Sequence, residues 1–308
     1  SNFSPFFITN NDRVYFSGSD GINGFELWTS DGVRDGPGTH LVKDLNPRHC
    51  NPDRYGLCSS FPESFRLLGD KIIFRADFGS DNNLIFGKLW RSDGTAEGTI
   101  VLDPIEDVIN NVNYLTILNN SKLVFSASNH ANGFELWITD GTAENTHILK
   151  DIVQGEWSSQ PKWLKKINES ILFVAGSTGI GRGLWKTDGT EEGTQLIKDI
   201  DPSNGTSECK NLSGNGLWLP GRTYFTAVDN LAFFNADDGV TRCELWSTDG
   251  TPEGTVRHGD IDPNNDDPQG GGYPSQITKI NDNTIAFQAN DGNIAPGHGT
   301  ELWFLRRE

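Results

Sequence analysis

The sequence predicts an all-β protein, a six-bladed β-propeller with four-stranded antiparallel blades, and three observations lead to this prediction. A Leu-Trp pair recurs roughly every 47 to 62 residues, which divides the chain into six units. Each unit carries four short strand-like runs and no helical periodicity. Polar turns of two or three residues join the first two runs, as antiparallel hairpins require. The single propeller domain spans residues 1–308, with its pairs at 27–28, 89–90, 136–137, 184–185, 245–246 and 302–303.

The repeat is most complete at residues 244–255, which read Glu-Leu-Trp-Ser-Thr-Asp-Gly-Thr-Pro-Glu-Gly-Thr. Its Leu and Trp are neighbours in a strand and point to opposite faces, which predicts a sheet covered on both sides. The Asp-Gly-Thr after this strand is typical of a tight turn, because Asp accepts a backbone hydrogen bond and Gly tolerates positive φ. We expect these carboxylates to be structural; the alternative is that they hold cations.

The sixth unit is shorter than the others. Only residues 304–308 come after Trp303, so we expect the sixth blade to have three strands and no Asp-Gly-Thr turn. An unpaired strand edge invites pairing with another chain. The sequence therefore predicts a docking edge for another extracellular protein or a copy of this one, made by Trp303, Phe304, Arg306 and Arg307; the alternative is a solvated three-stranded blade.

The run Glu-Leu-Trp-x-x-Asp-Gly-Thr-x-x-Gly-Thr, followed by Leu-Ile-Lys-Asp-Ile at 196–200, resembles the ELWxxDGT repeat proteins. That family is known mainly from large secreted or surface proteins of bacteria, and the resemblance implies a propeller without implying an activity. The chain departs from the pattern at Val33, which replaces Thr, and at Lys88 and Gly183, which replace Glu.

Composition narrows the possible partners and the compartment. A formal charge of -17 disfavours nucleic acid and anionic lipid, and no apolar run of eighteen residues predicts membrane insertion. Four cysteines indicate an oxidising compartment, so we expect a secreted or cell-surface protein. Because each pair falls in one unit, we expect disulfides Cys50–Cys58 and Cys209–Cys243 rather than a four-thiolate metal site. Sequons that permit glycosylation stand at Asn2, Asn119, Asn168, Asn204 and Asn211.

Two groups of residues on the longer loops are candidate binding sites. Aromatic side chains could form a stacking platform for a sugar, or else cover the insertions' own small cores; they are Trp157, Trp218, Tyr55 and Tyr273. Carboxylates that begin the loops between second and third strands could hold calcium, although no EF-hand spacing is present; they are Asp20, Asp237 and Asp291. No other cofactor is expected.

Sequence alone favours a non-catalytic protein-interaction or structural module in an extracellular assembly. A lectin-like carbohydrate-binding propeller is the first alternative. A hydrolase directed at glycans or esters is the second, although the Ser-x-Asp-x-Gly-x-Thr-Trp box of sialidases is absent. A Ser-His-Asp grouping stays open because such triads form in space rather than in sequence.

Overall fold

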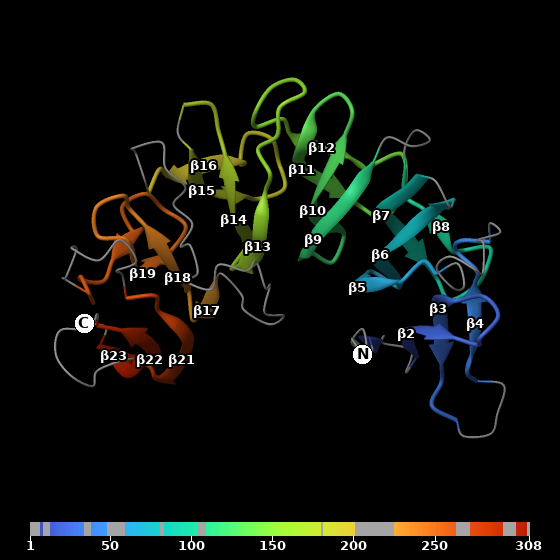
Figure 1. Cartoon of the computed structure of the whole chain (residues 1–308), viewed down its shortest axis with the longest axis horizontal. Helices are drawn as coiled ribbons and strands as arrows, with labels where there is room; N and C mark the ends of the chain where they lie inside the picture. Colours follow the sequence, from blue (N-terminus) through green and yellow to red (C-terminus); the bar gives the residue numbers. More distant parts are fainter. Residues whose placement is uncertain are drawn as a thin grey trace. The chain divides into compact units, whose positions relative to one another are not determined.

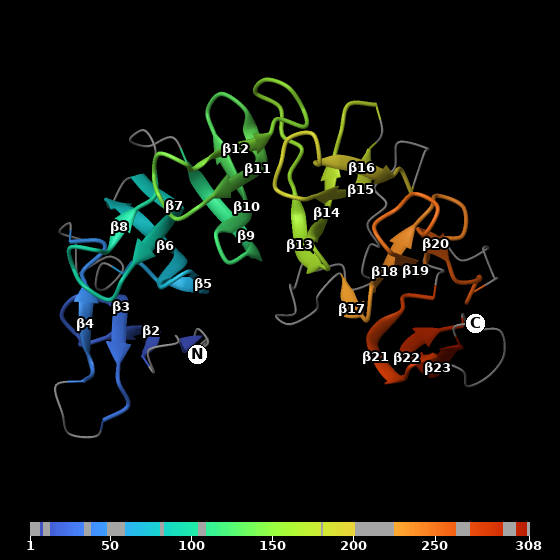
Figure 2. The ribbon, with the colours of Figure 1, turned by 180° about the vertical axis from the view of Figure 1, so that it is seen from behind.

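The structure of the protein is a computed structural model (Figures 1 and 2). It describes residues 7–8, 13–33, 38–47, 59–80, 83–103, 109–179, 181–200, 225–262, 272–291 and 300–306. Within these ranges all regular structure is β-strand, and no helix is present that could cross a membrane. The all-β prediction is therefore confirmed.

The strands form six separate antiparallel sheets, which we number 1 to 6 in chain order. Among the described residues, sheets 1 to 5 have four strands and sheet 6 has three, each in sequential order. The strands of sheets 1 to 3 are β1 (Phe7–Ile8), β2 (Val14–Ser19), β3 (Phe25–Ser30) and β4 (His40–Lys43); β5 (Glu63–Leu68), β6 (Lys71–Ser80), β7 (Asn83–Ser92) and β8 (Ile100–Val101); β9 (Asn110–Asn119), β10 (Lys122–Asn129), β11 (Gly133–Thr139) and β12 (His147–Lys150). Those of sheets 4 to 6 are β13 (Lys162–Ile167), β14 (Ser170–Gly176), β15 (Arg182–Thr187) and β16 (Gln195–Lys198); β17 (Thr226–Val228), β18 (Leu231–Asp237), β19 (Cys243–Thr248) and β20 (Val256–Arg257); β21 (Ser275–Asn281), β22 (Thr284–Asn290) and β23 (Thr300–Arg306).

The chain divides into two compact units, residues 1–160 with sheets 1 to 3 and residues 161–308 with sheets 4 to 6. We describe each unit by itself. The interpretation of residues 1–308 as one propeller domain stays a prediction.

Each sheet is built around the same cross-strand pair of aromatic side chains. The Trp of the Leu-Trp motif lies opposite a Phe of the second strand, as in Phe125 opposite Trp137 and Phe74 opposite Trp90. These two pairs stack with ring centroids 6.3 and 6.4 Å apart, a separation at which aromatic rings attract. The other four pairs are Phe16–Trp28, Phe173–Trp185, Phe234–Trp246 and Phe287–Trp303.

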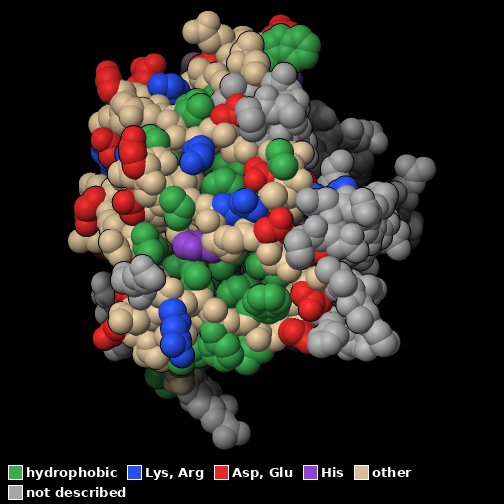
Figure 3. All heavy atoms as spheres, turned by 90° about the vertical axis from the view of Figure 1, so that its left-hand side faces the viewer, with side chains coloured by type: hydrophobic (Ala, Val, Ile, Leu, Met, Phe, Trp, Pro, Cys, Tyr) green, Lys and Arg blue, Asp and Glu red, His purple; other side chains and the backbone are tan. Residues whose placement is uncertain are grey.

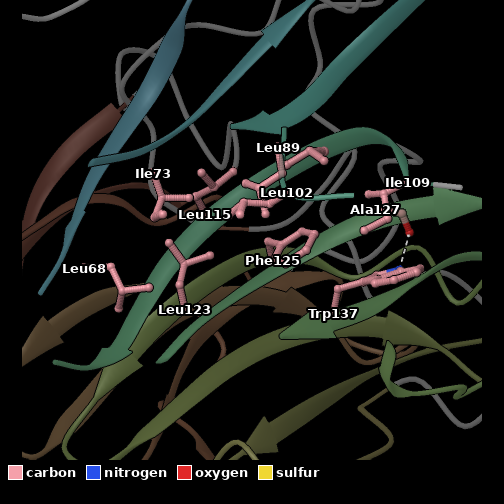
Figure 4. Close-up of a cluster of buried hydrophobic side chains, with 11 residues drawn as sticks. Leu68, Ile73, Leu89, Leu102, Ile109, Leu115, Leu123, Phe125, Ala127 and Trp137 are labelled. Carbon is pink, nitrogen blue, oxygen red and sulfur yellow. Dashed lines mark hydrogen bonds between the residues drawn. The ribbon is translucent and has the colours of Figure 1, made fainter. Parts of the chain in front are cut away.

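The Leu of the motif points to the opposite face and joins each sheet to the next one in the same unit. In unit 1, Leu89 of sheet 2 lies in one cluster with Leu115, Leu123 and Phe125 of sheet 3 (Figure 4). Trp137 lies beside Phe125 on the neighbouring strand, and its indole N–H donates to the carbonyl of Ala127 at 3.2 Å. Adjacent sheets in the unit therefore share a core. The prediction that both faces are covered is confirmed for sheet 2, because its Phe74 and Trp90 pack in a cluster with Leu27 of sheet 1 while its Leu89 packs on sheet 3.

The Asp-Gly-Thr turns are structural, as the sequence predicts. In sheet 3, Asp140 Oδ1 accepts hydrogen bonds from the backbone N–H and the hydroxyl of Thr142, at 2.9 and 2.7 Å. Gly141 between them has φ of 88°, which an L side chain rarely adopts. Val33 in sheet 1 keeps the backbone hydrogen bond to Asp31 at 2.9 Å but has no hydroxyl for the second one.

The Glu of the motif ties the end of one sheet to the start of the next. Glu135 is fully buried and accepts the backbone N–H groups of Ile152 and Ser159, at 3.0 and 2.9 Å, and the Ser159 hydroxyl at 2.6 Å. Ile152 and Ser159 both belong to unit 1, so one carboxyl group holds the two ends of the segment 152–159. Glu26 and Glu244 bind the flanking backbone in the same way.

Sheets 2 and 4 lack this Glu and replace it in different ways. In sheet 2, Lys88 pairs with Asp103 at 2.8 Å, both nearly completely buried, and Asp103 also accepts the N–H of Ile109 at 3.4 Å. Lys88 stands where the motif has Glu, and Asp103 stands where it has Lys, so the charges are exchanged. In sheet 4, a Cβ on Gly183 would lie 2.5 Å from Cδ1 of the Leu196 side chain and 3.2 Å from the Lys198 carbonyl oxygen, so a larger residue there would displace the Leu196 side chain.

The stability of the protein is expected to fall as pH rises from about 5 to 8. Burial raises the pKa of the three motif glutamates, Glu26, Glu135 and Glu244, to about 7, against an ordinary 4.5. A group whose pKa is higher in the folded state favours folding most below its unfolded pKa, and that contribution is lost as pH rises through 7. Melting temperatures recorded across this range test the prediction. Glu135→Gln should flatten the slope, and an unchanged slope in that variant would contradict this cause.

Candidate functional site

Sheet 5 departs from the repeat at two positions that face each other. The residue after the motif Trp is Arg91 in sheet 2 and Lys186 in sheet 4. Arg91 donates to the backbone carbonyl of Gly141 in the turn of sheet 3, and Lys186 donates to that of Gly250 in the turn of sheet 5. In sheet 5 this residue is the small Ser247. The fourth strands of the other four sheets carry a buried aliphatic residue where sheet 5 has His258; these are Val42, Leu102, Leu149 and Ile197.

The two exceptional residues are hydrogen-bonded to each other. His258 Nε2 lies 2.7 Å from Ser247 Oγ, within the range for proton transfer between a hydroxyl and an imidazole. Ser247 comes from β19 and His258 directly follows β20, and the N–H of His258 donates to Leu245 O at 2.8 Å. The imidazole packs on the ring of Phe233, with ring centroids 5.9 Å apart. Both side chains are therefore held by strands and by packing.

Burial lowers the pKa of His258 below its ordinary value of 6.5. The charged imidazolium loses hydration in this position, so the neutral ring is favoured near neutral pH. A neutral imidazole can accept a proton from a serine hydroxyl, whereas an imidazolium cannot. The environment thus holds His258 in the protonation state that a general base needs.

Ser247 and His258 open into a pocket of about 560 Å³ within unit 2. Leu231, Phe233, Val256 and Leu305 give it apolar walls, and Asp249, Asp282 and Arg306 supply charge. Figure 3 views the side on which β18–β23 lie and shows hydrophobic side chains gathered beside a histidine, with charged groups around them. The pocket is broadly open to solvent, and its lining combines apolar walls with a few charged groups, as the lining of small-molecule sites does.

The geometry suits nucleophilic catalysis at an acyl group. Ser247 Oγ is placed to attack and His258 to accept its proton, which are the first two roles of a serine hydrolase. Two carboxylates, Asp249 and Asp282, line the same pocket. Asp249 Oδ1 is occupied by Thr251 of the adjacent turn, and Asp282 pairs with Lys279 at 3.0 Å.

The aromatic residues predicted as a stacking platform are only partly placed. Trp157 is 75% exposed, and Tyr273, in unit 2, is half-buried and donates its backbone N–H to the Cys243 carbonyl at 3.0 Å. Tyr55 and Trp218 lie outside the described residues. The platform stays a prediction.

The three carboxylates predicted to hold calcium lie in three different sheets or loops. Asp20 accepts hydrogen bonds from Ile22 and Asn23 of its own loop, which hold its pKa below the ordinary value, and Asp237 accepts from Gly239 at 2.8 Å. Asp291 Oδ1 is buried without a hydrogen-bond partner in the described structure. Across the described ranges, no three His, Cys, Asp or Glu side chains form a group that could hold a metal ion.

The predicted covalent modifications are tested in part. Cys243 is disulfide-bonded, and no described cysteine is free. Its expected partner Cys209, like Cys50 and Cys58, lies outside the described residues, so both pairings stay predictions. Asn119 and Asn168 are exposed in hairpin turns, where an acceptor site would be accessible. The remaining sequons, at Asn2, Asn204 and Asn211, lie outside the described residues, and so does Arg307.

The sequence patterns did not single out either Ser247 or His258. A signal was present: when the six units are superposed on their Leu-Trp pairs, sheet 5 alone has Ser after Trp, and its fourth strand alone has His at the buried aliphatic position. Neither substitution is informative by itself. Their proximity follows from the antiparallel pairing of Ser247 with Val256, because His258, two residues after Val256, lies on the same face of the sheet and diagonally across from Ser247.

Comparisons with known proteins give fold similarity alone. No family model and no curated protein matches the chain. Among solved structures, the chain is similar to puromycin hydrolase (TM-score 0.54, 16% identity) and to a mutant of that enzyme complexed with PGG (TM-score 0.54, 15% identity). Each match covers 99% of this chain and 44% of the other. The chain therefore spans less than half the length of the enzyme it resembles.

These matches contradict the expectation of a non-catalytic interaction module. Both of these solved structures are of a protein named as a hydrolase, and the matches take in almost all of this chain. The expectation that the protein is not an enzyme is wrong on the same finding. The sequence favoured a non-catalytic module because most of its recurring residues are structural, and Ser247 and His258 are only two single departures from that repeat.

Proposed function

We propose that the protein is a hydrolase-type enzyme, or the β-sheet part of one, that cleaves ester or amide bonds at the Ser247–His258 pair. The observation that carries the proposal is the 2.7 Å contact between Ser247 Oγ and His258 Nε2 inside a pocket. The shared fold with puromycin hydrolase supports the reaction class, since that protein is a hydrolase by name. We also propose the six-bladed propeller for the six sheets, which the repeated Leu-to-Phe packing supports.

The proposed reaction has two steps at the same carbonyl carbon. Ser247 Oγ attacks that carbon while His258 Nε2 takes the hydroxyl proton, and His258 then gives this proton to the leaving alcohol or amine. Water, deprotonated by His258, then attacks the acyl-serine; the bond to Ser247 Oγ breaks, the acid is released, and His258 returns the proton to Ser247 Oγ. The apolar wall of Leu231, Phe233 and Leu305 would hold the acyl or leaving group of a substrate with an apolar side.

Ser247→Ala and His258→Leu are expected to abolish hydrolysis of p-nitrophenyl esters and aminoacyl arylamides, each by about 100-fold or more. His258→Leu introduces the residue that sheet 2 has at this position, so it should preserve the fold. Rates of chromophore release measure the effect. Mass spectrometry of protein treated with a fluorophosphonate should locate the adduct on Ser247.

Thr29→Ala is the matched control, because Thr29 occupies the position of Ser247 in sheet 1 without a facing histidine. This variant should keep full activity. Equal activity of Ser247→Ala and the parent protein, or an adduct on a different serine, would refute the proposed site.

A further inference from the structure

Sheet 5 departs from the repeat at a third position, beside the Ser247–His258 pair. It is the residue directly before the motif Phe of the second strand, and in sheet 5 this residue is Phe233, which is completely buried. Sheets 2, 3 and 4 have aliphatic residues there, sheet 6 has alanine and sheet 1 has tyrosine. These residues are Tyr15, Ile73, Val124, Leu172 and Ala286. Sheet 5 combines an aromatic ring at this position with a histidine on its fourth strand, where sheet 1 has Val42.

The position of Phe233 is one against which the fourth strand packs elsewhere in the repeat. In sheet 2, Ile73 and Leu102 belong to one buried cluster, and Leu102 stands where sheet 5 has His258. In sheet 5 the same contact is between a phenyl ring and an imidazole. Their ring centroids lie 5.9 Å apart, and the ring planes are inclined by 30°. An aliphatic contact of the repeat is thus replaced by a contact between two flat rings.

The imidazole of His258 reaches Phe233 by lying across the strand between them. The strand order is β18–β19–β20, and Phe233 of β18 is directly opposite Ser247 of β19. His258, which follows β20, contacts Phe233 with the face of its ring and Ser247 Oγ with Nε2, at 2.7 Å. In sheet 2 the residue directly opposite Ile73 is the long Arg91, whereas the small Ser247 leaves room for the ring.

The backbone does not by itself fix the direction of the imidazole. The N–H of His258 donates to the Leu245 carbonyl at 2.8 Å, and in sheet 2 the N–H of Leu102 donates to the Leu89 carbonyl at the same distance. The backbone is therefore held alike in the two sheets, and the rotamer of the side chain depends on its neighbours. Rotation of the imidazole away from Ser247 would lose the contact with the Phe233 ring.

We propose that Phe233 is a positioning residue for the reaction at Ser247, whose ring holds the imidazole of His258 with Nε2 at the serine hydroxyl. The proposal rests on the proposed function, in which Nε2 accepts the hydroxyl proton. A neutral ring whose Nε2 accepts has its own proton on Nδ1. An imidazole that turns away from Ser247 loses this constraint, so both neutral tautomers are then populated.

Nitrogen NMR of the intact chain, with isotope-labelled histidine, tests the proposal without substrate. At about pH 8 the imidazole is neutral, and we expect His258 of the parent protein to carry its proton on Nδ1 alone. His258→Leu identifies its signals. In Phe233→Leu we expect both tautomers, and ester hydrolysis slower by at least about tenfold because Nε2 is misplaced. Leu stands at this position in sheet 4, where Leu172 lies in one cluster with Ile197, so the variant should fold.

Phe234→Leu is the matched control. Phe234 is the next residue of β18, is also completely buried, and lies on the opposite face of the strand in a cluster with Leu172 of sheet 4. This variant should lower the melting temperature about as much as Phe233→Leu does and leave the tautomer and the rate unchanged. Phe233→Tyr keeps the ring, as Tyr15 does in sheet 1, and should keep the single tautomer. Phe233→Ile, with the residue of sheet 2, gives a second replacement if Phe233→Leu does not fold.

A single Nδ1–H tautomer in Phe233→Leu, or equal effects of the two Leu variants on the tautomer, would overturn the proposal, since Phe233 would then only fill the core. An Nε2–H tautomer in the parent protein would overturn it together with the proposed function, because Nε2 would then donate to Ser247. The two also separate. A parent protein that cleaves no ester, but loses its single tautomer in Phe233→Leu, would refute the hydrolysis and support the placement of the imidazole by Phe233.

Discussion

Lys88→Met is expected to destabilise unit 1 by about 3–5 kcal/mol, because it leaves the Asp103 carboxylate buried without its cation. The Lys88–Asp103 pair joins two side chains that are 3% and 8% exposed, at 2.8 Å. A buried charge that loses its partner costs far more than an exposed one, since water cannot replace the ion pair. Denaturant unfolding followed by circular dichroism measures the change.

The matched control is Arg75→Met, which removes the cation of the Arg75–Glu63 pair in the same sheet. That pair is more exposed, so its loss should cost about 1 kcal/mol or less. The exchange Lys88→Glu with Asp103→Lys restores the residues of sheet 1 and should recover most of the stability that Lys88→Glu alone loses. A Lys88→Met variant as stable as the parent would show that the pair contributes nothing net.

Trp137→Ala is expected to cost about 3–5 kcal/mol, since it removes a large buried side chain and leaves a cavity. Trp137 stacks on Phe125, is 3% exposed and donates to the Ala127 carbonyl (Figure 4). Trp157→Ala, on an exposed loop residue of the same unit, should change stability by less than about 0.5 kcal/mol. Thermal melting of the two variants gives the comparison, and similar melting temperatures would contradict a structural role for the motif tryptophans.

The regular part of the fold could be predicted because the same strand and turn pattern recurs in six repeat units. Each Leu-Trp pair fixes a strand buried on both faces, each polar turn fixes a hairpin, and both patterns depend on local chemistry that a sequence displays directly. The three strands that the described residues form in sheet 6 follow the same repeat, up to the strand that carries Leu302 and Trp303. The exchange of charge at Lys88 and Asp103 was visible only as two separate departures, because their contact depends on the register of β7 and β8.

The candidate site could not be predicted from any single residue. Ser247 and His258 are ordinary residues in an Asn-, Ser- and Thr-rich chain, and their chemistry arises from a 2.7 Å contact between neighbouring strands. The sequence pointed instead to long loops, where binding residues often concentrate. Here the pair lies within sheet 5 itself, and both residues line a pocket with residues of sheet 6.

The bond pattern between successive sheets has a consequence for synthesis on the ribosome. Lys43 donates to the carbonyl of Thr99, and Lys198 donates to that of Thr255, so sheets 1 and 4 each bind the sheet that is synthesised next. The Leu face of a newly translated sheet therefore stays exposed until about one more repeat unit has been synthesised, which at typical elongation rates takes several seconds. We expect the nascent protein to fold stepwise from its N-terminus, with one incomplete interface exposed to chaperones at any time.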